Sequence, residues 1–353
     1  MRRPISRSAG ARLALLLAGA TSAALAASQT AAGQSRAGGT SAYAIPRTPW
    51  GDPDLQGVWP VNNGVPMQRA VDLGERATLT DEEFARREAQ ARAQAAADAE
   101  LFVGNTPPAG RGGGAGIGPP AHWLERGIPT RETSLIIDPP NGRLPALTAE
   151  AEKRRTDARG GRGPTGEWRG EADSYEDLNI YYRCITRGVL GSMIPVIYGN
   201  GNQIVQAPGY VVLRQEMIHE SRVIPLDGRT HVSPGIRLYM GDSRGRWEGD
   251  TLVVETTNFT DKVAIGSNGA GYPGDPGHHS EALRLVERFT RTGENALEYV
   301  ATVEDPRTWT RPWTMRIRLT RSDDYQVHEY ACHEGNYAMR NILSGARAED
   351  APR

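Results

Sequence analysis

The chain has few of the residues that mark several large protein classes. Its 41 Lys and Arg residues are balanced by 42 Asp and Glu residues, which gives a formal net charge of −1. This balance argues against a general nucleic-acid-binding protein, which would carry a basic excess. Beyond the N-terminus no segment reaches the roughly 18 apolar residues of a transmembrane helix, so we expect no membrane span in the mature protein.

The sequence also lacks the spacings of common metal and nucleotide sites. The Cys-x-x-Cys and His-x-x-x-His spacings of zinc sites are both absent. The Gly-rich stretch 105–120 is bounded by prolines and lacks the Lys-Ser/Thr ending of a phosphate-binding loop. No Ser/His/Asp set is apparent. We therefore expect no metal and no organic cofactor.

The N-terminus has the composition of a Sec-type signal peptide. A basic stretch, MRRPISRSAGAR, precedes the apolar run LALLLAGATSAALA, and Ala24-Leu25-Ala26 fits a cleavage site. We predict a signal peptide at 1–27, a flexible leader at 28–47, and a secreted or periplasmic protein. The apolar run is short and rich in small residues, so a membrane anchor is the weaker interpretation.

Cysteine is rare, with two residues in the whole chain, Cys184 and Cys332. In an oxidising compartment two cysteines more often pair than stay free, so we predict a disulfide between them. They lie 148 positions apart. A loop of that length corresponds to roughly 4–5 kcal/mol of restriction of the unfolded chain in the entropy model. Two buried free thiols are the alternative.

The N-terminal region, 48–175, is expected to form an arm with helices and Gly/Pro-rich loops that packs on the main body. Its clearest element is a surface helix at 78–100, where Thr80 and Glu83 form a capping box. Two shorter elements follow, a buried strand and turn within 133–147 and a charged helix at 148–159.

From about residue 176 the pattern changes to the period-two alternation of β-strands. Short turn clusters such as PLDGR and RTGEN separate the segments, and such connections join antiparallel neighbours. We predict a mainly β domain at 176–345, an antiparallel curled sheet or a lipocalin-like up-and-down β-barrel, with a tail at 346–353. A sandwich remains the alternative. The predicted strands are 203–226, 236–241, 250–258, 281–291, 295–304, 312–321 and 324–332.

Glu287 is predicted to face the interior of this domain and to act as a catalytic acid or base. In LRLVERF, the side chains of Leu283, Leu285 and Phe289 share its face. Apolar surroundings raise the pKa of a carboxyl group, which suits proton transfer. The alternative is that Glu287 is paired with an arginine and only braces the structure.

The stretch 217–224 has two faces, and either could point inward. One face carries His219, and the other carries Glu220 and Arg222. His219 and Glu220 are candidate catalytic residues, and Arg222 is a candidate ligand-binding residue. A structural, hydrogen-bonded role is the alternative for His219.

The stretch HEYACHEGN, 328–336, gathers polar groups at the end of a predicted strand. On a regular strand His328, Tyr330 and Cys332 share one face, and Glu329 and His333 share the other. The two histidines therefore cannot bind one metal ion unless a bulge intervenes. We interpret the stretch as a disulfide anchor at a polar rim, with His328 and Glu329 as candidate catalytic residues and Tyr330 as a candidate ligand contact.

The stretch DPRTWTRPWT, 305–314, combines indole rings with guanidinium groups. Trp309, Trp313 and Arg307 together could form an amphipathic platform for an aromatic, sugar or carboxylate ligand. The alternative is that the tryptophans fill one end of the β domain.

Several long strings, in order from about residue 48 to 350, give the chain a family resemblance. It resembles a large group of secreted bacterial proteins of unknown function that carry these motifs. The resemblance implies a secreted single unit and assigns no chemistry to any residue; the Gly-rich stretch around 110–118 departs from the pattern of the group. The strings are GDPDLQGVW, TSLIIDPPNGRLPALT, RCITRGVLGSMIP, IPLDGR, MGDSRGRWEGDTLVVETTNFTDK, LRLVERFTR, VEDPRTWTRPWT and YACHEGNYAMRNILSGARAE.

These observations favour a secreted enzyme that binds a small, partly apolar or aromatic molecule and transforms it by cofactor-free acid/base chemistry of the hydrolase, lyase or isomerase type. A non-catalytic carrier of a hydrophobic ligand is the alternative. A metal-dependent hydrolase that uses His219, His328 or His333 is the weaker alternative. Substrate, reaction and oligomeric state stay open.

Overall fold

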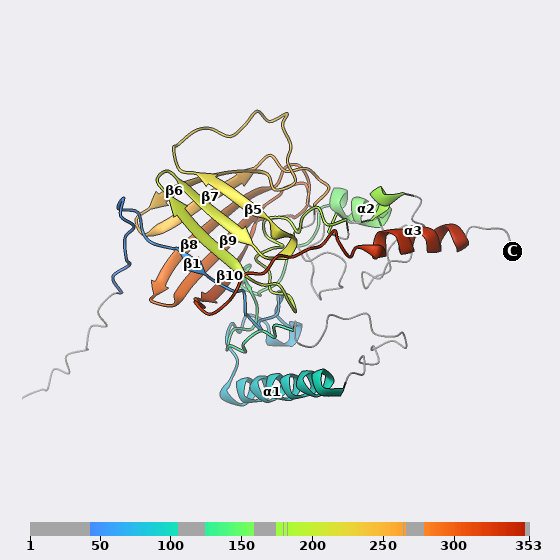
Figure 1. The fold of residues 1–353 in the computed structure, drawn as a ribbon, viewed down its shortest axis with the longest axis horizontal. Helices are drawn as coiled ribbons and strands as arrows, with labels where there is room; N and C mark the ends of the chain where they lie inside the picture. The colour runs from blue at the N-terminus through green and yellow to red at the C-terminus, as the bar shows by residue number, and fades with distance from the viewer. Residues whose placement is uncertain are drawn as a thin grey trace, which may run out of the picture. The chain divides into compact units, whose positions relative to one another are not determined.

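The computed structural model describes residues 43–104, 124–158 and 174–349, apart from 179, 182, 264 and 266–278. The predicted signal peptide, most of the predicted leader and the Gly-rich stretch 105–120 lie outside the described residues. Most of the regular structure within those ranges consists of two antiparallel sheets and three α-helices (Figure 1). No helix within these residues is long and apolar enough to cross a membrane.

The smaller sheet has four strands in the order β1-β3-β4-β5, each antiparallel to its neighbour. Alternate side chains of β3 to β5 are buried, among them Ile204, Val211, Leu213 and Ile224. This one-sided burial produces the period-two pattern of the sequence. The strands are β1 (Gly57–Val58), β3 (Asn202–Ala207), β4 (Tyr210–Gln215) and β5 (Ser221–Pro225).

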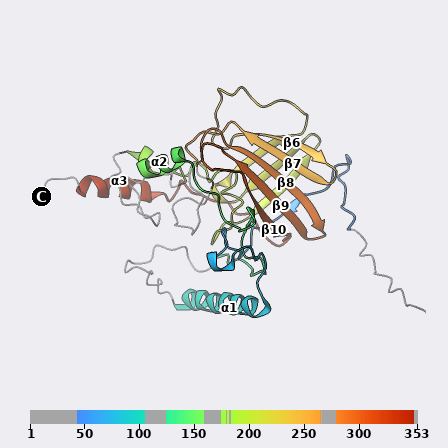
Figure 2. The same cartoon turned by 180° about the vertical axis from the view of Figure 1, so that it is seen from behind.

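The larger sheet has six strands in the order β2-β10-β9-β8-β7-β6, and Figure 2 shows β6 to β10 side by side in this sequence. Every neighbouring pair is antiparallel. The strands are β2 (Ile136–Asp138), β6 (Asp242–Glu248), β7 (Thr251–Thr257), β8 (Arg284–Gly293), β9 (Ala296–Glu304) and β10 (Trp313–Thr320).

The buried faces of both sheets contribute to one hydrophobic core. The sheets come together at β5 and β6, where a glycine is required. A Cβ at Gly245 would lie 2.6 Å from Leu226 and 2.8 Å from Ile224, so any larger residue would push the two strands apart. The mainly β, antiparallel class is confirmed. In the described residues the sheets do not close into the barrel that was one of the predicted forms.

Most predicted strands are present, but two are not. Residues 236–241 form turns with one isolated bridge, between Leu238 and Phe259, and residues 324–332 contain no strand. The second prediction is wrong: β10 already has β9 on one edge and β2 on the other, so the segment that follows cannot form a hairpin with β10. The charged stretch 241–250 forms the strand β6 and the turn that leads into β7 (Thr251–Thr257).

The helices include two that the sequence predicts and one that it does not. The capping box at the start of α1 (Asp81–Gly104) is confirmed, since the Thr80 N–H donates to Glu83 and the Glu83 N–H donates to Thr80 Oγ1. The helix α2 (Ala149–Ala158) matches the predicted charged helix. The unpredicted helix α3 (Tyr337–Glu349) buries Ala346 against Leu178.

Candidate functional site

Glu287 points into the core from β8, as predicted, but Arg222 and Tyr299 both bind its carboxylate there. Arg222 of β5 donates two hydrogen bonds to its carboxylate, at 2.5 and 2.9 Å, and Tyr299 Oη donates a third at 3.0 Å. Burial opposes the charge of Arg222, but the attraction of Glu287 outweighs it and raises the pKa of the guanidinium. With 0 % of Glu287 exposed, this carboxylate reaches no solvent. The geometry is that of a structural ion pair.

The two tryptophans also lie in the core and do not share a surface with Arg307. Trp309 and Trp313 are 2 % and 0 % exposed, and their rings meet edge to face with centroids 5.7 Å apart. The exposed Arg307 pairs with Glu150 of α2 instead. This arrangement matches the alternative in which the indoles fill one end of the β domain.

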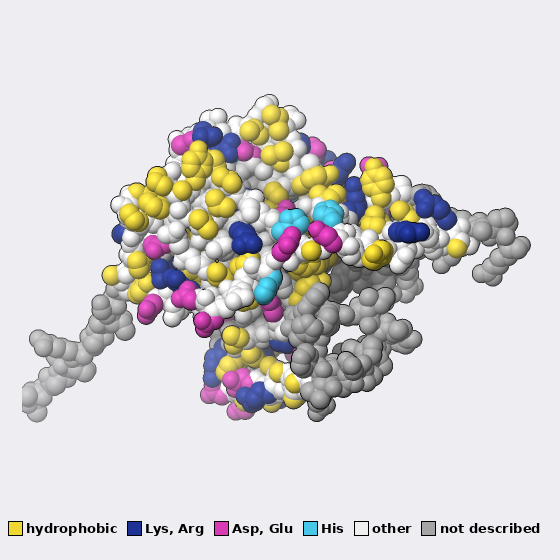
Figure 3. Space-filling model, in the orientation of Figure 1, with side chains coloured by type: hydrophobic (Ala, Val, Ile, Leu, Met, Phe, Trp, Pro, Cys, Tyr) yellow, Lys and Arg dark blue, Asp and Glu magenta, His cyan; other side chains and the backbone are white. Residues whose placement is uncertain are grey.

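A different group of polar residues gathers where three segments meet beside the four-stranded sheet. The segments are the loop 181–201, the turn 216–220 after β4, and the segment 325–333 after β10. The predicted disulfide between Cys184 and Cys332 is confirmed and joins the first segment to the third, with Cα atoms 5.7 Å apart. In Figure 3 histidine side chains lie beside acidic ones on the displayed face. We call this region the junction site.

The turn after β4 has a strained backbone. Ile218 and His219 have φ angles of 59° and 45°, in the left-handed region that a β-branched residue rarely adopts. The turn interrupts the predicted strand 203–226, so the alternation of faces expected for 217–224 applies only from Ser221 onward. Strain of this kind persists where surrounding contacts hold it, and it is concentrated at functional sites.

Four sequence candidates lie at the junction site. His219 is exposed, and its Nδ1 lies 2.9 Å from the carbonyl oxygen of Tyr330, so Nδ1 carries the proton of the neutral ring. Glu220 is half-buried and accepts a long hydrogen bond from the Arg187 N–H. His328 is exposed and Tyr330 is half-buried.

The remaining candidates do not converge with these four. Glu329 is exposed. Arg222, like Glu287, belongs to the core.

Three further residues at the junction site, Glu125, Glu216 and Tyr325, lie within hydrogen-bond distance of one another through the Tyr325 hydroxyl, and the sequence analysis did not predict them. Tyr325 Oη lies 2.7 Å from Glu125 Oε1 and 2.8 Å from Glu216 Oε2. A phenol has one proton, so both contacts can be hydrogen bonds only if one carboxyl group is protonated and donates to the phenol oxygen. We call Glu125, Tyr325 and Glu216 the carboxyl–phenol triad.

Burial indicates which carboxyl group holds the proton. Glu216 is 8 % exposed, and burial raises its pKa, with the charge of Glu125 acting in the same direction. The hydrogen bond of Tyr325 and a charge on His328 act against this rise. Glu125 is more exposed, and its Oε2 also accepts the N–H of Asn200 at 2.9 Å. Burial therefore favours Glu216 as the carboxyl group that carries the shared proton of the triad.

A glycine makes the triad sterically feasible. A Cβ on Gly201 would lie 2.3 Å from Glu216 Oε2 and 2.7 Å from the Tyr325 ring. The glycine in YGNGN thus lets the backbone approach both side chains. A glycine directly before a strand is a weak signal by itself, which is why the sequence did not reveal this site.

Other arrangements are less suited to chemistry. No group of three or more His, Cys, Asp or Glu side chains among the described residues is positioned to hold a metal ion. The stretch 241–245, GDSRG, has the Gly-x-Ser-x-Gly spacing of a nucleophile elbow. Its Ser243 lies on the antiparallel strand β6, buried, with its Oγ 2.9 Å from Thr256 Oγ1. A nucleophile elbow instead exposes its serine between a strand and a helix.

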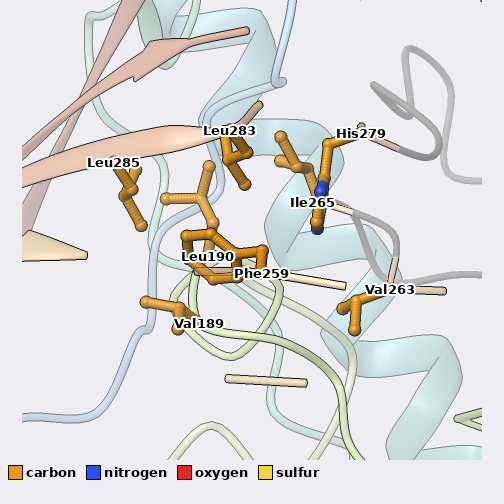
Figure 4. Close-up of a pocket in the computed structure, with 8 residues that line it drawn as sticks. All are labelled: Val189, Leu190, Phe259, Val263, Ile265, His279, Leu283 and Leu285. Atoms are coloured by element: carbon orange, nitrogen blue, oxygen red, sulfur yellow. The ribbon is translucent and has the colours of Figure 1, made fainter. Parts of the chain in front are cut away.

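A small apolar pocket is lined by Val189 and Leu190 of the loop 181–201 and by residues from 259–285 (Figure 4). It measures about 260 Å³ when the open solvent at its mouth is counted, but only about 10 Å³ is free for the centre of a water-sized molecule. This is far below the ~300–1,000 Å³ of typical ligand pockets. Its one polar side chain among the described lining residues is His279, whose Nδ1 donates to the Ser280 carbonyl. Burial lowers the pKa of His279, so the ring is neutral.

Comparison of the chain with models of known protein families and with curated proteins finds no match.

Proposed function

We propose that this protein is a secreted enzyme that transforms a small, partly apolar or aromatic molecule by cofactor-free acid/base chemistry at the junction site. The reaction is of the hydrolase, lyase or isomerase type. The observation that carries the proposal is the position of Tyr325 Oη, within hydrogen-bond distance of two carboxyl groups.

The triad supplies both halves of acid/base catalysis. Glu216, whose pKa burial raises, is the general acid, and Glu125 is the general base; a pair of carboxyl groups is a common basis for such roles. Tyr325 lies between them and can pass a proton from one to the other. Burial, together with contacts with both carboxyl groups, raises the pKa of the Tyr325 phenol, so it is not ionised. His328 lies within electrostatic reach of Glu216.

The disulfide supports the proposed location. Disulfides persist mainly in oxidising compartments, and both cysteines of the chain are used in one. Together with the composition of the N-terminus, this favours export from the cytoplasm.

The test compares Glu216→Gln with the wild type. Each purified protein is incubated with a small-molecule extract, and the products are compared by mass spectrometry. We expect some metabolites to be consumed by the wild type and by Glu334→Gln, an exposed carboxylate control, but not by Glu216→Gln. Tyr325→Phe should also be inactive, because it breaks the proton path. Identical product profiles for Glu216→Gln and the wild type would remove the triad from the mechanism.

A carrier is the second candidate, because Glu287 is in fact held by Arg222 in an ion pair and a small apolar pocket exists. A carrier would retain an unchanged ligand through purification, detectable by native mass spectrometry. Retention with no consumption of any metabolite would favour this function.

A further inference from the structure

Arg187 is a buried cation that forms no salt bridge with a carboxylate of the described residues. Arg187 is 2 % exposed, and its Nε and Nη2 atoms have no hydrogen-bond partner among the described residues. Arg222 offers the comparison: it is equally buried, and both of its terminal nitrogens bind Glu287. An unpaired buried charge costs several kcal/mol, so a chain that retains one needs a compensating role for it.

Aromatic side chains surround Arg187. Its guanidinium carbon lies 5.9 Å from the ring centroid of Tyr181. The rings of Tyr198 and Tyr330 are stacked, 6.3 Å apart and 8° from parallel, and their hydroxyl groups are 3.5 Å apart. All three tyrosines are half-buried, so each is partly accessible to solvent, and all three act electrostatically on Arg187.

The neighbours of Arg187 do not neutralise it fully. Burial, and next the nearby Tyr198, raises the pKa of Tyr181 to about 12 against the opposing charge of Arg187. Burial also raises the pKa of Tyr330, so these phenols are uncharged at neutral pH. Glu220 is the nearby acid, but its Oε2 contacts the Arg187 backbone N–H at 3.4 Å, and burial raises the pKa of this carboxyl group too. Burial in turn lowers the pKa of Arg187, as expected where its charge lacks compensation.

We propose that Arg187, with Tyr181, Tyr198 and Tyr330, binds the carboxylate group of a small aromatic acid. A guanidinium with two unused donors matches a carboxylate in charge and in fork geometry. Tyrosine faces beside it suit an aromatic ring. As a statement about the substrate this rests on the proposed function, but the binding itself can be measured without turnover.

The position of Arg187 relative to the triad supports a shared ligand. Tyr181 Oη lies 3.7 Å from Met217 Sδ, and Met217 follows Glu216 directly in the chain. Tyr330 is in the same segment as Tyr325, and its carbonyl oxygen binds His219. A molecule anchored at Arg187 therefore extends toward the acid/base groups.

The experiment is a calorimetric titration of the full-length mature protein with benzoate, with benzyl alcohol as the neutral counterpart and inorganic phosphate as a second anion. We expect saturable binding of benzoate and at least about tenfold weaker binding of the other two, a difference of about 1.4 kcal/mol. Absence of benzoate binding, or tighter binding of phosphate or of benzyl alcohol, would overturn the proposal.

Variants assign the binding to Arg187. Arg187→Met should lose benzoate binding by about tenfold or more. The matched control, Arg183→Met, removes a neighbouring arginine that lies over the Tyr175 ring and should bind as the wild type does. If Arg187→Met does not fold, Arg187→Lys keeps the charge but lacks the planar fork, and it should also bind more weakly. Unchanged binding by the folded variant contradicts the proposal.

The triad variant separates the two proposals. Glu216→Gln should bind benzoate like the wild type, because Arg187 is intact. If Glu216→Gln binds benzoate and keeps full turnover, the proposed anion site is supported and the proposed catalytic role of the triad is contradicted. If turnover depends on Glu216 but the protein does not bind benzoate, the catalytic role is supported and the anion site is contradicted.

Discussion

Arg222 of β5 holds Glu287 of β8 through two hydrogen bonds, and this pair joins the two sheets inside the core. Ser243 and Thr256 lie 3.4 and 3.5 Å from the same guanidinium nitrogen, so the pair is embedded in a polar network. The network links β5 of the smaller sheet to β6, β7 and β8, which are consecutive strands of the larger sheet. It fixes how the smaller sheet lies on the larger one.

The first prediction is that breaking this pair destabilises the fold far more than removing it. Glu287→Gln or Arg222→Met should each lower the free energy of unfolding by about 3–5 kcal/mol, because each leaves one buried partner unsatisfied. The double variant Arg222→Met/Glu287→Leu should recover most of that loss. Urea unfolding of the four proteins measures the coupling. Additive losses in the double variant would mean that the two residues do not act as a pair.

The strands on which this pair lies were predictable, but the pairing was not. The sequence places Glu287 on the inner face because Leu285 and Phe289 lie two positions before and after it, and residues two apart on a strand share a face. Its partner is 65 positions away, and the sequence left the orientation of Arg222 open. The absent strand at 324–332 shows the converse limit: alternation indicates which residues could form a strand, but it does not show that a free sheet edge exists.

The triad shows why the candidate site was largely missed. Tyr325 is separated by 200 positions from Glu125 and by 109 from Glu216, so no local motif contains two of them. Each residue taken alone looks like an ordinary polar surface residue. The polar stretch 328–336 did indicate the correct region of the chain, because the disulfide holds it beside the turn after β4.

The second prediction concerns that disulfide. Cys184→Ser/Cys332→Ser should lower the free energy of unfolding by about 2–5 kcal/mol, because the bond closes a long loop in the unfolded chain. The segment 325–336 has no helix or strand to hold it, so it should also lose protection locally. Hydrogen exchange followed by mass spectrometry should show faster exchange there than in β7 to β10. Equal exchange in both proteins would show that other contacts position the segment.

The third prediction uses Gly201 to disturb the triad without removing any of its functional groups. Gly201→Ala should displace Glu216 or Tyr325, because the new methyl group would contact both. We expect a loss of about 1–3 kcal/mol in stability and a large loss of turnover. Gly335→Ala is the matched control, since nothing lies within 4 Å of its added Cβ. Wild-type turnover by Gly201→Ala would show that the close approach is not needed.

The fourth prediction is a pH dependence that isolates Glu216. Burial raises the pKa of this carboxyl group in the folded protein, so the group takes up a proton on folding. Its contribution to stability is therefore fully present below the unfolded pKa of about 4.3, and it is lost as the pH rises through the folded pKa. Tyr325, Glu125, His328 and Arg214 act on the same group.

Glutamine copies the protonated form of Glu216 and does not titrate. The free energies of unfolding of Glu216→Gln and the wild type should therefore be closest at low pH. As the pH rises, the difference between them should change in favour of Glu216→Gln. Urea unfolding at a series of pH values measures the difference, and Glu334→Gln, at an exposed position, should show none. A difference that moves in the opposite direction would mean that the charged form of Glu216 is the one favoured by the fold. In that case the general acid of the triad would have to be Glu125.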